Sequence, residues 1–477
     1  RGANLSDDKK GQLRSINEQL SVLTLEFGEN ILTETNNFKM VIEDESQLAG
    51  LPENVRQTAA EAASEDSMEG KWMFTVHKPS MLPFLQYSEV RPLREKLFKA
   101  YMNLGNNNNE YDNKEILKKM VNLRIDRANL LGYESHADYM LADRMAEKPD
   151  NVDELLTEIW TSALPVAKNE ADMLQEMIYQ EGHDFELKPW DWWLFAEKVR
   201  KAKYDLDEEQ LRPYFELENV REGVFELANR LFGLSFDEIT DIPKPHPDAL
   251  AFEVKEADGS HVGILYMDFH PRQSKRGGAW MSSYRKQYQK NGEYIHPVIT
   301  NVCNFSKPTG NKPALLSLDE VHTLFHEFGH ALHGLLSDCT YPSLSGTSVP
   351  RDFVELPSQI MENWVLEPEM LKFYAKHYET GEIIPDSLIA KIKESALFNQ
   401  GFAMGEYLAA SFLDMDYHTL TEPLTEDVLT FEEKAMDDIG LIEEIIPRYR
   451  STYFRHIFAS GYSAGYYSYI WAEVLDA

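Results

Sequence analysis

The most constraining feature of this chain is the five-residue pattern His326-Glu327-Phe328-Gly329-His330. On an α-helix, residues four apart lie one turn apart on the same face, so His326 and His330 can present two imidazole nitrogens to one metal ion. Glu327 lies at the edge of that face, where a carboxylate can reach an activated water without being a ligand. The pattern predicts a helix that holds a catalytic zinc ion, with peptide-bond hydrolysis as the leading hypothesis.

The residues around this pattern support a helix over about residues 317–337. Ser317 and Glu320 have the spacing of a capping box, which marks a helix start. Apolar residues then recur at intervals of three and four, as on the buried face of an amphipathic helix. They are Leu318, Val321, Leu324, Phe325, Phe328, Leu332 and Leu335.

Two further histidines, His322 and His333, extend the stripe formed by His326 and His330. A catalytic zinc ion takes three protein ligands and keeps one position open. We therefore expect His322 and His333 to pack against neighbours or to support the ligands rather than to bind metal.

The third ligand is expected to be a carboxylate from a following helix. The metzincin pattern would need a glycine and a histidine where this chain has His333 and Leu336, so that class is excluded. Asp352, Glu355 and Glu362 lie one or two helical turns apart in the next helical segment. The residues alone do not separate these three candidates, and each could equally be a solvated helix charge.

Several sequence blocks resemble the thimet-oligopeptidase family of zinc peptidases, whose bacterial members include oligopeptidase A and the peptidyl-dipeptidases. The resemblance runs from about residue 189 to the end, and the first half matches only in its helical, acidic character. The six-residue spacing from His456 to Tyr462 resembles the peptidyl-dipeptidases more than the animal oligopeptidases, which have one residue fewer. The blocks are TLFHEFGHALHGLL, DFVELPSQIMENW, PWDWW, KRGGAWM, HPVITNVCNFSKP, HIFASGYSAGYYSYIW and the segment 204–236.

The resemblance implies one zinc ion per chain, with His326, His330 and Glu355 as ligands and Glu327 as the general base. It also implies catalytic roles for a histidine and two tyrosines near the C-terminal end, which would contact the scissile carbonyl and the oxyanion. These are His456, Tyr462 and Tyr469, with Tyr466 beside them as a substrate contact. On spacing alone, the same segment could be an aromatic part of the core.

Two further substrate contacts are expected. Gly278 and Ala279 precede a β-rich run, and small residues there would let an extended peptide approach a strand edge, as the family resemblance also favours. A peptidase that removes C-terminal dipeptides needs a cation for the substrate carboxylate. Arg450 is our choice for this role, with Arg448 and Arg455 as alternatives, and all three could instead form surface ion pairs.

The net charge and the cysteine content indicate which binding partners and which cellular compartment to expect. The formal net charge of −33 argues against binding to nucleic acid or to an anionic membrane. The two cysteines, Cys303 and Cys339, form no CxxC pair and are interpreted as free thiols, which fits the cytoplasm without excluding the periplasm. No apolar run is long enough for a membrane span. Because the chain begins at Arg1 and ends in a helix without a cap, we expect it to be truncated.

The predicted fold is mainly α, with two interleaved helical lobes around a deep substrate channel and a small β-sheet next to the zinc helix. Residues 1–477 would form one truncated catalytic unit, with 1–240 as a helical channel wall and 241–477 carrying the sheet, the zinc site and the tyrosines. Strands are expected at 252–256, 262–268 and 296–305, the first two joined at Asp258-Gly259. Helices are expected at 7–34, 89–104, 112–131, 151–181, 219–232, 317–337, 352–377 and 386–414.

Three functions compete. The first is zinc-dependent release of C-terminal dipeptides from short peptides by a monomeric enzyme. The second is endo-acting cleavage by an oligopeptidase with the same chemistry. The third is a non-catalytic peptide-binding protein on this fold, which would be expected to lack the base or a ligand. His326, Glu327, His330 and Glu355 are all present, which argues against the third.

Overall fold

A computed structural model describes residues 1–477, which form two compact units that interleave along the chain. Unit 1 consists of residues 1–203 and 397–468, and unit 2 consists of residues 204–396 and 469–477. The mainly helical class with a small sheet and interleaved lobes is confirmed. The boundaries between the units differ from a division at residue 240.

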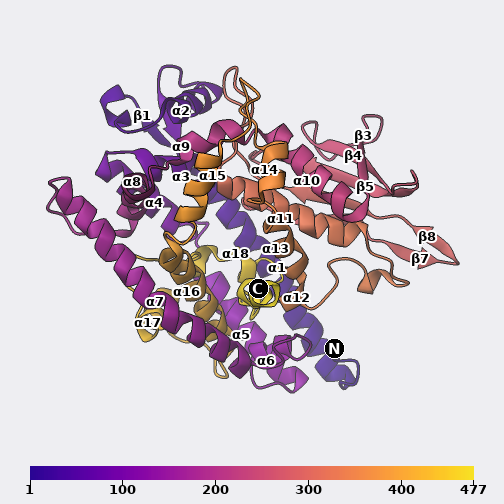
Figure 1. The fold of residues 1–477 in the computed structure, drawn as a ribbon. Coiled ribbons are helices and arrows are strands. Elements are labelled where there is room, and N and C mark those ends of the chain that lie inside the picture. The colour runs from indigo at the N-terminus through magenta and orange to yellow at the C-terminus, as the bar shows by residue number, and fades with distance from the viewer. The chain divides into compact units, whose positions relative to one another are not determined.

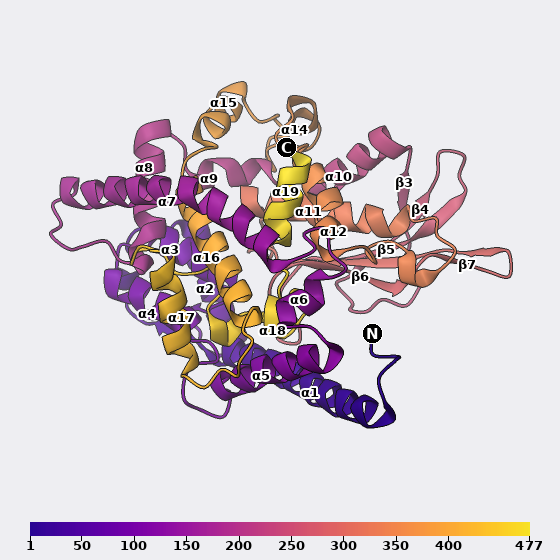
Figure 2. The same cartoon turned by 90° about the horizontal axis from the view of Figure 1, so that it is seen from below.

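Unit 1 is built from helices around a long antiparallel contact between α7 (Pro149–Gln180) and α16 (Gln400–His418), which lie side by side in Figures 1 and 2. A Cβ atom on Gly401 would lie 2.4 Å from the backbone nitrogen of Ala167, so only glycine permits this approach. Next to it, the rings of Trp192 and Phe402 stack at 4.7 Å between centroids. The other helices of this unit are α1 (Asp7–Asn37), α2 (Glu53–Glu65), α3 (Lys78–Tyr87), α4 (Arg91–Met102), α5 (Lys114–Leu131), α6 (His136–Leu141), α8 (Trp192–Tyr204), α17 (Val428–Asp438) and α18 (Arg455–Phe458), and β1 (Met40–Ile42) pairs with β2 (Trp72–Phe74).

Unit 2 contains a five-stranded mixed sheet with the order β3-β4-β5-β9-β6. The predicted hairpin is confirmed, because β4 and β5 pair antiparallel around Gly259, whose φ of +86° suits glycine. Strand β9 runs parallel to β5, and β6 lies antiparallel to β9 at the edge of the sheet. The strands are β3 (Ser235–Glu238), β4 (Leu250–Lys255), β5 (His261–Asp268), β6 (Trp280–Arg285) and β9 (Val298–Val302), with a separate hairpin of β7 (Tyr288–Lys290) and β8 (Glu293–Ile295).

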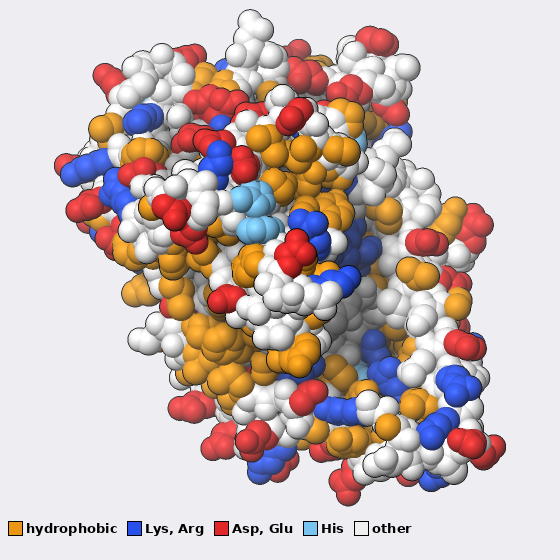
Figure 3. Space-filling view, turned by 90° about the vertical axis from the view of Figure 1, so that its right-hand side faces the viewer, with side chains coloured by type: hydrophobic (Ala, Val, Ile, Leu, Met, Phe, Trp, Pro, Cys, Tyr) orange, Lys and Arg blue, Asp and Glu red, His pale blue; other side chains and the backbone are white.

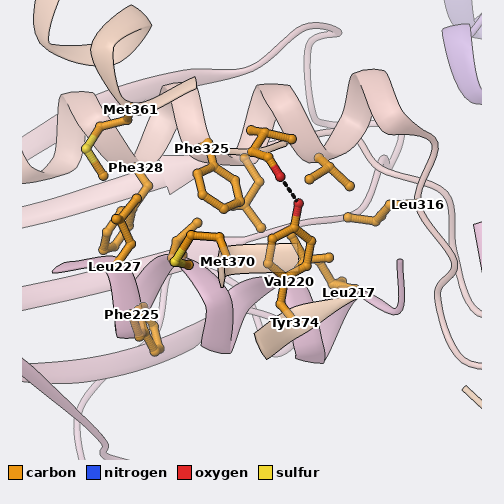
Figure 4. Close-up of a cluster of buried hydrophobic side chains, with 14 of the residues drawn as sticks. Leu217, Val220, Phe225, Leu227, Leu316, Phe325, Phe328, Met361, Met370 and Tyr374 are labelled. Atoms are coloured by element: carbon orange, nitrogen blue, oxygen red, sulfur yellow. Dashed lines mark hydrogen bonds between the residues drawn. The ribbon is translucent and has the colours of Figure 1, made fainter. Parts of the chain in front are cut away.

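Helix α11 (Leu318–Leu335) lies against this sheet and carries the histidine pattern. Its apolar side chains point into the main core of unit 2, where Phe325 and Phe328 face α10 (Leu217–Phe232) through Val220 and Leu227 (Figure 4). In the same cluster the hydroxyl of Tyr374 donates a 2.6 Å hydrogen bond to a backbone carbonyl. The core thus fixes one face of α11 and leaves the histidine face for chemistry.

Two helices predicted as continuous are broken. The predicted helix 352–377 is three short helices, because Pro357 and Pro368 lack the N–H that a continuing helix requires. The predicted helix 386–414 is interrupted at Asn399, which adopts a left-handed φ of +67°. The pieces are α12 (Arg351–Val354), α13 (Leu356–Glu362), α14 (Pro368–Tyr374), α15 (Asp386–Ser395) and α16. Glu355 therefore lies at the junction of α12 and α13.

The surface carries the excess of acid. Figure 3 shows Asp and Glu side chains spread around the face that it draws, with smaller groups of Lys and Arg among them. Cys303 and Cys339 are free thiols, as predicted. None of the helices has the length and apolar character needed to cross a membrane.

Candidate active site

The start of α11 is fixed by the predicted capping box. The Ser317 hydroxyl accepts a hydrogen bond from the Glu320 amide at 3.1 Å, and the Glu320 carboxylate accepts from the Ser317 amide at 2.8 Å. The same carboxylate accepts from the Ser306 amide at 2.8 Å, which ties the helix start to the segment after β9. In its middle, α11 is held to β9 by Asn301, whose side-chain amide donates to the Glu327 carbonyl at 2.7 Å. These contacts set the rotation of the histidine face.

Gly329, inside the histidine pattern, allows α13 to pack directly on α11. A Cβ atom at this position would lie 2.6 Å from the Cα of Ser358 and 2.7 Å from the carbonyl oxygen of Pro357. Any larger residue would push the two helices apart. This close packing carries the α12–α13 junction, and with it Glu355, to the histidines.

His326, His330 and Glu355 form a compact cluster in which the three candidate ligand atoms lie within 4.8 Å of one another. The Oε2 atom of Glu355 lies 3.2 Å from Nε2 of His326 and 3.1 Å from Nε2 of His330. Ligands about 2.1 Å from a tetrahedral zinc ion are separated by about 3.4 Å. The spacing and the two-histidine, one-carboxylate donor set therefore fit zinc.

Glu362 supports this cluster from behind. One of its carboxylate oxygens lies 2.7 Å from Nδ1 of His326, the ring nitrogen opposite the one that faces Glu355. A carboxylate in this position fixes the tautomer of a metal-binding histidine and raises its basicity. Of the three carboxylates that the sequence left open, Glu355 faces both histidines, Glu362 faces the outer nitrogen of His326, and Asp352 is buried outside the cluster.

The electrostatics of the cluster favour a positive charge. Burial opposes ionisation of Glu355, but His330 and His326 outweigh it and hold the pKa of that carboxyl well below its usual range. Burial also raises the pKa of Glu362, yet hydrogen bonds from His322 and His326 lower it to about 2. Burial disfavours a charged His326, but Glu355 and Glu362 raise its pKa well above the usual value. Carboxylates that stabilise a proton here would stabilise a divalent cation by the same attraction.

Glu327 has the properties of a proton acceptor that is not a ligand. Its side chain is buried, and burial raises the pKa of its carboxyl although His326 and His330 act in the opposite direction. Its Oε2 atom has no hydrogen-bond partner in the protein. A buried carboxylate oxygen without a partner is costly unless a water or substrate satisfies it. This fits a group that takes a proton from an attacking water.

The two remaining histidines of the stripe lie outside the cluster. Nδ1 of His322 is 3.8 Å from the Glu362 carboxylate, so this histidine contributes to the charge around the ligands. His333 is partly buried, and its burial lowers its pKa. Neither joins the group of three ligand atoms.

Gly278 and Ala279 lead into the edge strand β6. Gly278 has a left-handed φ of +84°, and its carbonyl accepts a 2.6 Å hydrogen bond from the side chain of Asn304. Ala279 packs partly buried against the core of unit 2. No strand pairs with the outer side of β6 in the five-stranded sheet. The segment has the exposed edge that pairing with an extended peptide requires.

Tyr469 belongs to unit 2, at the start of α19 (Ser468–Asp476). Its carbonyl accepts a 3.0 Å hydrogen bond from the side chain of Gln359, and Asn363 donates to Asp476 at 2.9 Å. Both donors lie in or directly after α13, the helix that packs on Gly329. Tyr469 is thus attached to the helix that follows the candidate ligand Glu355.

His456, Tyr462 and Tyr466 lie together in unit 1. The Tyr462 amide donates to the His456 carbonyl at 3.0 Å, and their rings are 5.8 Å apart. The His456 and Tyr466 rings are 5.2 Å apart. The Tyr466 carbonyl accepts a 2.6 Å hydrogen bond from Tyr407. The segment folds back on itself, but Tyr466 is buried and also packs against the rings of Phe454 and Tyr407, so it belongs to an aromatic cluster, whereas Tyr462 is partly exposed.

The arginines expected to dock a substrate carboxylate already have partners. Nε of Arg450 lies 2.6 Å from the carboxylate of Glu432, in a mostly buried ion pair. Arg455 donates to the Gly28 carbonyl at 2.8 Å. Arg448 lies 4.0 Å from the Glu406 carboxylate, a longer and more exposed contact. Arg450 can bind a substrate only in competition with Glu432.

Two features of the site were not predicted from the sequence. The first is Gly329, to which the sequence analysis assigned no role, although its lack of a side chain determines how close α13 comes. Asn301, which holds the middle of α11 to the sheet, was not singled out. A glycine between two histidines on an amphipathic helix is a usable signal for close helix packing, whereas nothing in the sequence marks Asn301.

Comparison with known proteins finds a matching peptidase family and similar peptidases. Residues 84–477 match the model of peptidase family M3. The chain is 43% identical to dipeptidyl carboxypeptidase of Escherichia coli (strain K12), over 99% of this chain and 70% of the relative. It is 36% identical to oligopeptidase A of Haemophilus influenzae, over 100% of this chain and 71% of the relative.

A solved structure of PZ peptidase A with an inhibitor has a similar fold. The TM-score is 0.52 at 15% sequence identity, over 99% of this chain and 66% of that chain. The chain thus spans about two thirds of the length of the proteins that it matches.

Proposed function

This chain belongs to peptidase family M3, and we propose that it hydrolyses peptide bonds in short peptides with one zinc ion bound by His326, His330 and Glu355. The observation that carries the proposal is the convergence of these three ligand atoms within 4.8 Å, with Glu327 next to the first histidine. The residues are those of a metallopeptidase, and none of the four is missing.

Zinc, when bound at this cluster, supplies a Lewis acid that polarises the scissile carbonyl and makes water acidic enough to attack at neutral pH. Glu327 takes the proton from that water and returns it to the leaving amine. Burial, which raises the pKa of this carboxyl, brings it closer to the value at which it can do both. Glu362 keeps the His326 ring oriented through its 2.7 Å contact with Nδ1.

The oxyanion needs donors that are fixed before the reaction. We assign this role to Tyr462 and Tyr469, with His456 alongside, and assign substrate contact to Tyr466. The support is the family resemblance of this segment and the compact fold of the loop around His456. Gly278 and Ala279 would receive the extended substrate at the edge of β6.

Removal of C-terminal dipeptides is the subtype that the comparisons support best. The relatives with 43% and 41% identity are both dipeptidyl carboxypeptidases, whereas oligopeptidase A relatives have 36–37% identity. A dipeptide register requires a cation for the free carboxylate. Arg450 remains the candidate although it pairs with Glu432 at 2.6 Å, and Arg448, whose guanidinium lies 4.0 Å from the Glu406 carboxylate, is the alternative.

Endo-acting cleavage is the second candidate, and the oligopeptidase A relatives favour it. Mass spectrometry of a defined decapeptide digest separates the two. A peptidyl-dipeptidase releases dipeptides stepwise from the free C-terminus, and C-terminal amidation slows it strongly. Internal cleavage of the amidated peptide at an undiminished rate would reject the dipeptide subtype. Loss of all products with a chelator, restored by zinc, tests the metal in the same assay.

We further propose that the protein is a monomer in the cytoplasm. Its partners would be short peptides, and not nucleic acid or membranes. The free thiols Cys303 and Cys339 support a reducing compartment, and the net charge of −33 opposes binding to polyanions.

A further inference from the structure

A buried carboxylate in unit 1 binds the backbone of the loop that carries the tyrosines. Asp414 on α16 is fully buried. Its Oδ1 accepts from the Ala464 amide at 2.9 Å, and its Oδ2 accepts from the amides of Gly465 and Tyr466 at 2.8 and 2.9 Å. Three consecutive N–H groups that converge on one point form an anion-binding nest. Here the protein fills the nest with its own side chain.

The carboxylate is connected to a buried cation through a histidine. Nδ1 of His418 lies 2.7 Å from Oδ1 of Asp414, and its Nε2 lies 2.7 Å from a guanidinium nitrogen of Arg124. Because arginine only donates, Nε2 of His418 must accept, and the ring is neutral with its proton on Nδ1. Burial lowers the pKa of His418 despite Asp414, which agrees with this assignment. The tautomer leaves His418 able to donate to Asp414.

Arg124 holds the other end of the same loop. Its second guanidinium nitrogen donates to the carbonyl of Ile457 at 2.7 Å, directly after His456. Asp414 therefore binds the end of the loop at residues 464–466, and Arg124 binds its beginning. His136 adds a contact between them, with Nε2 3.0 Å from the Ser463 hydroxyl.

The backbone between these anchors is strained. Ala464 has a φ of +48°, in the left-handed region that residues with a Cβ rarely occupy. Such a conformation persists where the surroundings over-determine it, and it is concentrated at functional sites. The strained residue is one of the three whose amides bind Asp414. In the chain it lies midway between Tyr462 and Tyr466.

We propose that Asp414, His418 and Arg124 are positioning residues that hold the loop 456–466 in the conformation in which Tyr462 and Tyr466 serve the reaction. The inference rests on the proposed function, because it assumes that these tyrosines contact the substrate. Donors aimed at a developing charge lower the barrier only when they are fixed beforehand. The three residues fix this loop at both ends without touching the substrate themselves.

Asp414→Asn is the test variant, since it keeps the shape but loses the charge and turns an amide NH₂ towards backbone N–H groups. Glu170→Gln is the matched control. Glu170 is also buried in unit 1, and its carboxylate accepts from the amides of Gly401 and Phe402 at 3.2 and 2.8 Å, outside the tyrosine loop. Both variants remove a buried carboxylate that binds consecutive amides. Only the first touches the loop.

For Asp414→Asn we expect kcat to fall about 10- to 100-fold with KM changed less than about threefold, because small displacements of positioned groups have effects of this size. Affinity for a phosphinic peptide that mimics the tetrahedral intermediate should fall by the same factor, and zinc content should not change. The amides of residues 464–466 should exchange hydrogen faster. Glu170→Gln should keep the wild-type kcat. If Asp414→Asn does not fold, His418→Gln is expected to show the same pattern with a smaller change.

The possible results distinguish failure of the positioning role of Asp414 from failure of the proposed role of the tyrosines. A wild-type kcat in Asp414→Asn, while Tyr462→Phe is slow, would overturn the inference alone. An equal loss of kcat in Glu170→Gln would also overturn it, because the effect would then be general destabilisation. Wild-type kcat in both Tyr462→Phe and Tyr469→Phe would overturn the proposed role of the tyrosines and the inference with it.

Discussion

The candidate zinc site of unit 2 and the tyrosine loop of unit 1, residues 456–466, both place a few polar groups precisely. They do so in different ways. In the cluster, His326 and His330 are one helical turn apart, and their geometry follows from α11 itself. In the loop, the anchors Asp414 and Arg124 lie 50 and 333 residues away from the backbone groups that they bind. One arrangement is local and the other is built by tertiary contacts.

Their electrostatics differ as well. The carboxylates of Glu355 and Glu362 face histidine nitrogens that a cation can share, so the cluster can accept a charge from outside. The carboxylate of Asp414 is enclosed by three amides and a histidine of its own chain, so its donors are already used. The first region is organised to bind an ion and the second to keep a shape.

Removal of a metal ligand should have the largest effect. We expect His330→Ala and Glu355→Ala to lose zinc and all measurable peptidase activity, because each removes one of only three protein ligands. His333→Ala, on the same helix but outside the cluster, is the control and should keep both. Zinc is measured by elemental analysis after purification without chelator. Full zinc content in Glu355→Ala would transfer the ligand role to another carboxylate, such as Asp352 or Glu362.

Loss of a tyrosine hydroxyl should come next. Tyr462→Phe and Tyr469→Phe should lower kcat about 10²- to 10³-fold with little change in KM, because their contacts tighten as the oxyanion forms. Tyr467→Phe, a fully buried tyrosine of the same segment, serves as the control. Steady-state kinetics on one peptide measures all three. An effect confined to KM would make the two tyrosines binders of the ground state.

Loss of the supporting carboxylate should weaken the metal without abolishing binding. We expect Glu362→Gln to reduce zinc affinity about 10- to 100-fold, as removal of such a partner of a histidine ligand typically does. Competition with a chelator of known affinity measures the change. Glu369→Gln, an exposed glutamate of the same unit, should bind zinc normally. Unchanged affinity in Glu362→Gln would mean that the 2.7 Å contact to His326 does not matter for the metal.

The smallest effect concerns Asp416, the neighbour of Asp414 on α16. Burial, with Asp438 and Asp153 nearby, raises its pKa from 3.8 to about 7. The folded state therefore prefers the protonated form, so this group's contribution to stability is present at low pH and is lost as the pH rises from about 4 to about 7. Asp416→Asn should raise the melting temperature at pH 8 by roughly 2–4 °C, about 1 kcal/mol for a domain of this size, and leave it unchanged at pH 4. Asp437→Asn, at an exposed position of α17, should show no such dependence on pH.

The sequence predicted the parts of the molecule whose structure is local. The capping box at Ser317 and the hairpin at Gly259 were both recognised, because each follows from spacing within a few residues. The family was also recognised from its sequence blocks, and the match of residues 84–477 confirms it. Single-residue breaks were missed, because Pro357 and Asn399 interrupt helices whose apolar periodicity continues past them.

The parts that depend on tertiary contacts could not be derived from the sequence. Sequence spacing did not distinguish Asp352, Glu355 and Glu362 as the third zinc ligand. Only the packing of α13 on Gly329 brings Glu355 to the histidines. Asp414 was not considered at all, because an aspartate in a helix is usually solvated, and its three amide donors lie 50 to 52 residues further along the chain.

The most direct test of the central claim is zinc content and turnover measured together in Glu327→Gln. Glu327 lies beside the cluster without being one of its three ligand atoms, and it is the proposed base. The account predicts about one zinc ion per chain, as in the wild type, with kcat lower by about 10²- to 10⁴-fold. Hydrolysis of the decapeptide at the wild-type rate would contradict the assignment of the base, and loss of zinc would make Glu327 a ligand rather than a proton acceptor.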